Sequence, residues 1–205
     1  MMSLGCRLKI ICLIILVTLA TSFCTSKNFL VINYQLPSET VTVKDSAVSI
    51  VFEDQRTDLR LVSKSAKMAL KDFSGNFALI VARDKTDERL VGAFSLNSML
   101  KTIFKQRLES AGLQVASDDQ DRQTVLEIIL KEFKLDLVNR KWIVHISYQA
   151  NLLKQNRFVT GQTITGNAER LRVVGSKDAE KVIGELITDA VNRLDLDELF
   201  QTTRS

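Results

Sequence analysis

The chain is poor in the residues that cross-link a fold or bind transition metals. Among its 205 residues it has one histidine, one proline and three cysteines, which are Cys6, Cys12 and Cys24. The part after Cys24 therefore folds without a disulfide, and a site of the usual cysteine–histidine zinc type is excluded there. We expect an apolar core alone to hold the fold, with no bound metal and no cofactor.

A strong excess of either charge is also missing. The chain has 28 Lys and Arg residues against 24 Asp and Glu residues. Removal of a leading segment that carries Arg7 and Lys9 would leave 26 basic residues and a net charge of +2. No basic stripe with interleaved aromatic residues occurs either, so we expect no binding of nucleic acid.

The first 24 residues have the pattern of an export signal. Two basic residues precede an unbroken apolar run at 10–17, small residues follow, and Cys24 comes next. The run is shorter than the roughly 20 residues that cross a bilayer. The pattern therefore indicates export, with lipid attachment at Cys24. Two alternatives stay open, because Phe23 is unusual before a lipidated cysteine. Cleavage after Ser22 would give a soluble exported protein, and an uncleaved segment would remain as a membrane anchor.

The sequence divides into four parts. Residues 1–23 form the signal peptide, and 24–46 form a lipidated N-terminus and tether that contains one extended piece at 29–34. Residues 47–196 are expected to form a single domain, which is long enough to bury a core. Residues 197–205 are expected to be a flexible tail.

Apolar side chains spaced three and four residues apart predict two amphipathic helices. The first has Ser95 as its N-cap and stops at Gly112, since glycine accepts the left-handed conformation that ends a helix. The second has Ser176 as its N-cap and ends near Leu194. A shorter helix is expected around 63–70.

Segments rich in β-branched and aromatic residues predict five strands, the last three as a meander. Within 125–138 the alternation changes phase near Lys131, which predicts a bulge there. Strands and helices together predict an α+β fold, a largely antiparallel sheet with two amphipathic helices packed on one face as a two-layer sandwich. The expected strands are 47–52, 77–82, 125–138, 141–152 and 158–174, with turns at 74–76, 139–140 and 155–156.

The single histidine is a weak candidate for chemistry. His145 lies in the polar phase of a strand beside Ser147. A nucleophile and base pair would also need an orienting carboxylate, and nothing in the sequence supplies one at a matching position. We expect a solvated histidine on the outer face of a sheet.

Acidic residues form two clusters. The three aspartates within 118–121 lack the glycine and the distal glutamate of a calcium loop, which favours a solvated turn. Glu53, Asp54 and Asp58 follow a strand, and Arg56 between them is a ready ion-pair partner. We therefore expect no catalytic residue and no enzyme activity.

The order of several short motifs resembles that of the YajG-type family of uncharacterised bacterial lipoproteins. The resemblance implies a lipid anchor at Cys24, no enzyme activity and no known ligand. It also implies that Asp54 and Arg56, which match the family's most recognisable polar motif, have the structural role of closing the first core strand. The matching segments are Asp54-x-Arg56, Gly92 to Leu96, Leu108 to Gly112, Trp142 and Gly175 to Glu180.

These expectations define three candidate functions. The first is a non-enzymatic cell-envelope lipoprotein, tethered on the periplasmic side of a membrane, with the outer membrane favoured, that binds a protein partner or an envelope component. The second is an accessory lipoprotein subunit of an envelope transport or lipopolysaccharide-assembly machine. The third and least favoured is a periplasmic hydrolase, which would need a pocket with perturbed carboxylates.

Overall fold

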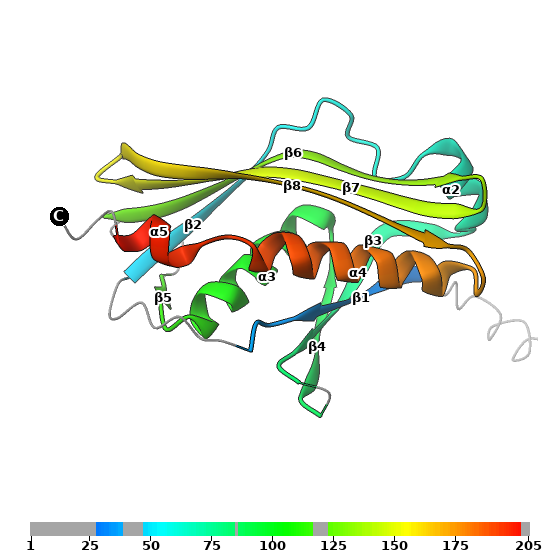
Figure 1. Cartoon of the computed structure of the whole chain (residues 1–205), viewed down its shortest axis with the longest axis horizontal. Coiled ribbons are helices and arrows are strands. Elements are labelled where there is room, and N and C mark those ends of the chain that lie inside the picture. The colour runs from blue at the N-terminus through cyan, green and yellow to red at the C-terminus, as the bar shows by residue number, and fades with distance from the viewer. Residues whose placement is uncertain (1–27, 39–46, 85, 117–122, 202–205) are drawn as a thin grey trace, which may run out of the picture.

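The computed structural model describes residues 28–38, 47–84, 86–116 and 123–201. The predicted signal peptide, Cys24 and the aspartates within 118–121 lie outside these residues. The described residues form two β-sheets with helices between and beside them (Figure 1).

The larger sheet has five strands in the order β5-β2-β6-β7-β8. Its long members β6, β7 and β8 pair antiparallel as a meander, whereas β2 pairs parallel with β6 on one side and with the short β5 on the other. The strands are β2 (Ala47–Asp54), β5 (Gln114–Val115), β6 (Thr124–Val138), β7 (Lys141–Lys154) and β8 (Arg157–Leu171).

The smaller sheet has three strands in the order β1-β3-β4. β1 (Asn28–Gln35) pairs parallel with β3 (Phe73–Ala82), which pairs antiparallel with β4 (Glu88–Phe94). The two sheets also touch directly, because Phe77 of β3 meets Phe133 of β6 edge to face with ring centroids 6.4 Å apart.

The two long helices lie between the sheets (Figure 1). α3 (Leu96–Ser110) contacts β2, β3 and β4, while α4 (Ser176–Asn192) contacts β1, β7 and β8. α2 (Lys64–Ala69) packs on β6, and α5 (Leu196–Gln201) packs on β8. No helix among the described residues is long and apolar enough to cross a membrane.

The predicted α+β class is confirmed, and the expected single sheet is divided into two mixed sheets. The bulge predicted near Lys131 is also confirmed, since the β6–β7 register shifts between Leu130 and Glu132. Before the bulge Ile128 is buried, and after it Phe133 is buried in the opposite phase. The predicted turns at 139–140 and 155–156 are confirmed, and all four residues have positive φ.

Of the two N-caps that the sequence predicts, one is confirmed and one is wrong. The Ser95 side chain accepts the N–H of Ser98 and caps α3 as expected, and Ser63 caps α2 in the same way. The prediction of Ser176 as a cap is wrong. Gly175 is the N-cap of α4, with φ 75 and no side-chain hydrogen bond.

Two strands differ from the sequence-based expectation. The predicted turn at 74–76 is wrong, because β3 begins at Phe73 and includes these residues. β4 was not expected from the sequence, since Leu90 and its other outward side chains are exposed and its seven residues lack a clear alternation.

The folded part is longer than 47–196. Ile32 and Tyr34 of β1, in the predicted tether, are fully buried. Leu199 and Phe200 of α5, in the predicted tail, are buried as well. Both segments therefore add to the same apolar core.

Candidate functional site

The Asp54–Arg56 pair closes the end of β2. Nε and one terminal nitrogen of Arg56 each donate to a different carboxylate oxygen of Asp54 at 2.8 Å, which is a two-point contact. The main-chain N–H of Arg56 donates to the same carboxylate at 3.3 Å. Two-point pairing of this kind fixes both side chains in one orientation.

The carboxylate of Asp54 is held in its charged form. Hydrogen bonds from Arg56, assisted by one from the Asn97 side chain, lower the pKa of Asp54 to about 2. The side chains of Arg56 and Asp54 are only 6% and 15% exposed. A carboxylate that is ionised and already engaged by these donors is a poor general acid or base near neutral pH. The geometry therefore supports the structural role that the sequence analysis predicts for this pair.

The neighbouring acidic residues also have polar partners. Glu53 accepts a hydrogen bond from the side chain of Gln55 at 2.8 Å. Asp58 pairs with Arg60 at 2.8 Å and with Lys134 of β6 at 3.1 Å. Hydrogen bonds from Arg60 keep the pKa of Asp58 below its usual range. These contacts join the segment after β2 to β6.

His145 lies on the exposed outer face of the large sheet, as predicted. Its ring hydrogen-bonds with Asn167 across the β7–β8 pair, and Ser147 hydrogen-bonds with Thr165 at 3.1 Å. Each of these side chains therefore has a neutral partner on β8. Among the described residues, no group of three or more histidine, cysteine or acidic side chains is arranged to hold a metal ion.

A groove runs between β1 and α4. It has a volume of about 640 Å³, and its lining includes Val31, Asn33, Lys181, Gly184 and Thr188. The helix backbone approaches the strand closely at Gly184, because a Cβ atom there would lie 2.8 Å from the carbonyl oxygen of Asn33. Only glycine allows this approach.

Side chains of α4 hydrogen-bond with the main chain of β1, which is an edge strand. Thr188 Oγ1 accepts the N–H of Gln35 at 3.1 Å, and Asn192 donates to the Gln35 carbonyl at 2.9 Å. Glu180 accepts the N–H of Val31, although partial burial raises the pKa of this carboxyl. Since these side chains occupy the polar groups that another strand would use, α4 protects this edge of the sheet from pairing.

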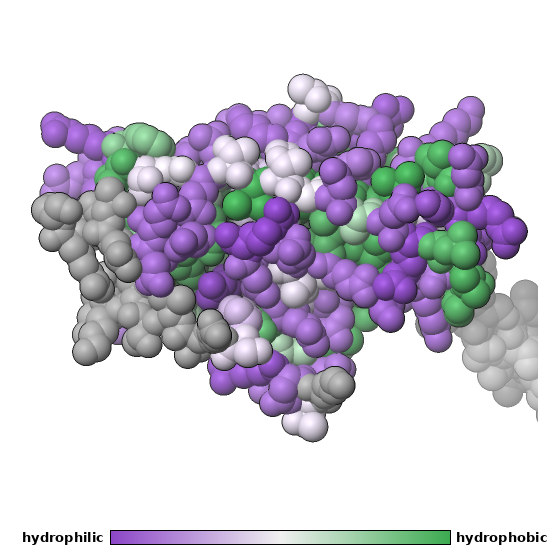
Figure 2. Space-filling view, in the orientation of Figure 1, coloured by the Kyte–Doolittle hydropathy of each residue, from purple (hydrophilic) through white to green (hydrophobic). Residues whose placement is uncertain are grey.

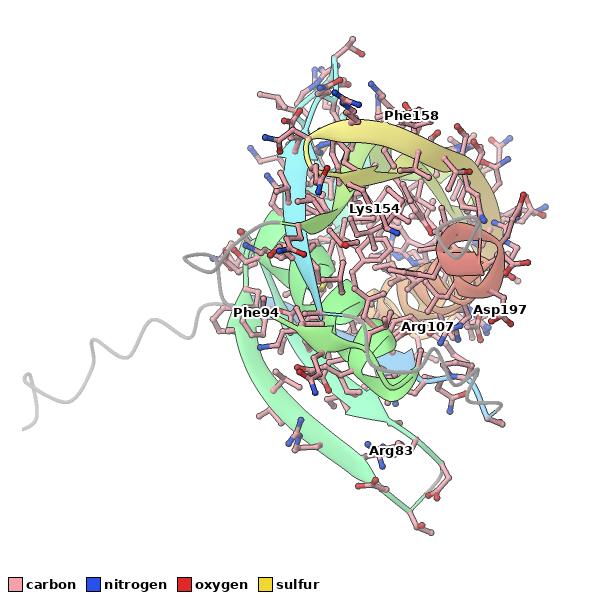
Figure 3. All side chains as sticks on the ribbon, turned by 90° about the vertical axis from the view of Figure 1, so that its left-hand side faces the viewer. Arg83, Phe94, Arg107, Lys154, Phe158 and Asp197 are labelled. Carbon is pink, nitrogen blue, oxygen red and sulfur yellow. The ribbon has the colours of Figure 1, made fainter. Side chains whose placement is uncertain are left out.

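A buried cation lies in the core on α3. Arg107 is 5% exposed, and its Nε and Nη1 atoms have no hydrogen-bond partner among the described residues. Burial lowers the pKa of Arg107, an effect that Tyr34, Tyr148 and Asp197 oppose. Arg107 and Asp197 lie near each other in the view of Figure 3, in agreement with the electrostatic effect of Asp197 on Arg107. Arg107 was missed from the sequence because it is charged, although its spacing of four residues from both Ile103 and Ala111 places it on the apolar face of α3.

Comparison with known proteins supports the fold. No family model matches the chain, and no curated protein matches it. Protein XCC0632 of Xanthomonas campestris, described under family-model DUF330, is similar with a TM-score of 0.52 and 14% identity, over 84% of this chain and 99% of that one. This likeness shows a shared fold.

Two further solved structures are more distant. The uncharacterised lipoprotein B of Nitrosomonas europaea has a TM-score of 0.43 and 11% identity, over 83% of this chain and 93% of that one. The rare lipoprotein B of Shewanella oneidensis has a TM-score of 0.41 and 11% identity, over 76% and 96%. TM-scores below 0.5 do not support an inference about function. The YajG-type resemblance is not confirmed by these comparisons.

Proposed function

We propose that the protein is a non-enzymatic cell-envelope lipoprotein, tethered to a membrane on its periplasmic side through Cys24, and that its domain binds a protein partner. The observation that carries the proposal is the position of Cys24 between an export-signal pattern and the first strand of the fold. Three residues separate Cys24 from Asn28, where β1 begins.

This spacing changes the expected role of the tether. A chain of four residues spans at most about 14 Å, so an acylated Cys24 would hold the start of β1 close to the bilayer. Stable attachment requires more than one acyl chain, which a diacylglyceryl cysteine provides.

A partner-binding role is supported by the β4 edge of the small sheet. α4 covers the β1 edge, whereas β4 forms the opposite edge, and its Leu90 side chain is 67% exposed. An extended segment of another protein can add to such an edge through main-chain hydrogen bonds. We place the partner at this edge.

The anchor is tested in a bacterium with two membranes that produces the full chain in the presence of labelled palmitate. We expect the natural chain to incorporate the label and to stay with the membranes after a high-salt wash. Cys24→Ser is expected to lose both properties. Phe23→Ala is the matched control, because it keeps Cys24 and places a small residue before it, and it should be labelled at least as well. Absence of label in the natural chain would show that it is not a lipoprotein.

The partner is tested with a photo-crosslinking amino acid at Leu90 and, as a control, at Leu59, which is exposed to a similar degree. We expect one discrete crosslinked product from Leu90 and none of that size from Leu59. Equal or absent crosslinking from both positions would count against β4 as the docking edge.

A further inference from the structure

One end of the molecule combines the start of β1 with several loops and turns (Figure 1, right). We call it the anchor-side end and define it as residues 28–30, 64–73, 136–142 and 169–178. Main-chain and side-chain contacts hold it together. The N–H of Arg172 donates to the carbonyl of Arg140 at 2.8 Å, and the indole N–H of Trp142 donates to the carbonyl of Gly175 at 3.1 Å. A further pocket at this end is lined by Phe29, Lys71 and Ser176, among others.

Exposed apolar side chains gather at the anchor-side end. Six of the ten large hydrophobic side chains that are exposed among the described residues belong to it, and Figure 2 shows apolar surface at this end. Val173 is the most exposed of them at 74%. Single exposed hydrophobic residues are ordinary, but a cluster marks an interaction surface. The six are Phe29, Met68, Val138, Leu171, Val173 and Val174.

The apolar loop between β8 and α4 is held in place by its polar contacts. The carboxylate of Asp178 accepts the main-chain N–H groups of both Val173 and Val174. The guanidinium of Arg172 lies over the Trp142 ring, 6.0 Å from its centroid. These contacts fix the loop backbone while the two valine side chains remain in solvent.

The anchor-side end is also basic. It contains eight Lys and Arg residues against four Asp and Glu residues, a net charge of +4 within a processed chain whose total is +2. Three of the four acids already have partners at this end. Glu169 pairs with Lys141 at 2.7 Å, Asp136 accepts hydrogen bonds from the Ser65 side chain and the Leu137 N–H, and Asp178 binds main-chain N–H groups. The basic residues are Lys64, Lys67, Lys71, Arg140, Lys141, Arg170, Arg172 and Lys177.

We propose that the anchor-side end rests on the surface of an anionic phospholipid membrane. Its valine, leucine and methionine side chains enter the headgroup region, and its basic side chains contact lipid phosphates. This inference depends on the proposed lipid anchor, which would leave the same end within about 14 Å of the bilayer. Apolar insertion and attraction to anionic lipid are the two forces that bind proteins in the membrane interface. Each basic side chain near an anionic surface strengthens binding by roughly fivefold.

In this arrangement the long strands of the large sheet run away from the membrane surface. β7 runs from the anchor-side end to the β7–β8 turn, and its 14 residues span about 45 Å at the usual rise of a strand. The far end carries Phe158, which is 64% exposed. This end faces the viewer in Figure 3, where Phe158 is labelled. Phe158 and the adjacent Arg157 therefore serve as matched controls for the apolar and basic residues near the membrane.

The test uses the full chain, acylated in the producing bacterium and reconstituted into vesicles of phosphatidylethanolamine with phosphatidylglycerol. Val174→Cys or Phe158→Cys introduces one thiol for a nitroxide label, because the acylated Cys24 does not react. The accessibility of the label to oxygen and to a water-soluble nickel complex is then compared. We expect an oxygen-to-nickel ratio several-fold higher at Val174 than at Phe158. In the Val174→Cys background, Arg140→Glu with Arg172→Glu should lower this ratio, whereas Arg157→Glu should leave it unchanged.

The outcomes separate this inference from the proposed function. An acylated protein whose label at Val174 is as exposed to water as the label at Phe158 overturns the inference and leaves the lipid anchor standing. Equal contact of both labels with lipid overturns it too, since the domain would then lie flat. A mass measurement that finds Cys24 unmodified overturns both.

Discussion

Arg107 is a charged residue in a place where an apolar one would fit. Its side chain is buried on α3 among Tyr34, Tyr148 and other core residues, and two of its nitrogens have no partner among the residues described. Burying an incompletely paired charge costs free energy that an apolar side chain of similar size does not.

We therefore expect Arg107→Met to raise the free energy of unfolding by about 1 to 3 kcal/mol. Urea unfolding followed by circular dichroism measures the change. Lys105→Met is the control, because the Lys105 side chain is half exposed on the same helix and its replacement should shift stability by less than about 0.5 kcal/mol. A clear loss of stability in Arg107→Met would instead show that the guanidinium makes net favourable contacts in the core.

The charged form of Asp54 makes the stability of the fold depend on pH. Its pKa of about 2 in the folded protein lies below the ordinary value of 3.8. Stabilisation by the charged form is therefore complete above about pH 4 and is lost as the pH falls through about 2.

Asp54→Asn is expected to lower the free energy of unfolding by about 2 kcal/mol at pH 7. At pH 2 the difference from the natural chain should have largely disappeared. Arg56→Met should raise the pKa of Asp54, and the loss of stability in acid would then begin at higher pH. Denaturation midpoints measured between pH 2 and pH 7 test this, and parallel curves for the natural chain and Asp54→Asn would contradict it.

At the scale of single elements, α4 connects the two sheets and covers the edge of β1. Its contact with Asn33 depends on Gly184, where a Cβ atom would approach a main-chain oxygen to 2.8 Å. Main-chain atoms of a paired strand cannot move aside as a flexible side chain can.

Gly184→Ala should therefore destabilise the protein by about 1 to 3 kcal/mol through overpacking, even though alanine favours a helix more than glycine does. Lys181→Ala, one turn earlier and exposed on the same helix, is the matched control and should have little effect. If Gly184→Ala were stabilising by the helix-propensity difference, the close contact with β1 would not exist in solution.

Local patterns predicted local structure well. The phase change around Lys131 predicted the bulge, and Ser95 and Gly112 predicted the ends of α3. The Asp54–Arg56 pair could be predicted because its two members are two residues apart. Gly175 as the cap of α4 could not, since the choice between Gly175 and Ser176 depends on how the preceding loop is held by Trp142 and Asp178.

At the scale of the whole molecule, prediction failed where distant segments meet. The parallel pairing of Leu30 with Phe77 joins residues 47 positions apart, and no local pattern encodes it. The division into two sheets follows from this pairing. The anchor-side end was missed for the same reason, because its apolar and basic residues come from four separate segments and gather only in the folded chain.

The fold and the N-terminal sequence lead to one picture of the molecule. A signal-type segment ends at Cys24, the domain begins four residues later, and the end of the domain nearest to that point is both apolar and basic. A lipid anchor and a membrane-facing surface would then act together, and the far end and the β4 edge would stay available to a partner.

The intact mass of the mature protein, purified from the membrane fraction, tests this picture most directly. We expect a chain that begins at Cys24 and carries the added mass of a diacylglyceryl group, and we expect that addition to be absent from Cys24→Ser. An unmodified chain that begins at Phe23 would contradict the central claim, because the protein would then be exported without an anchor.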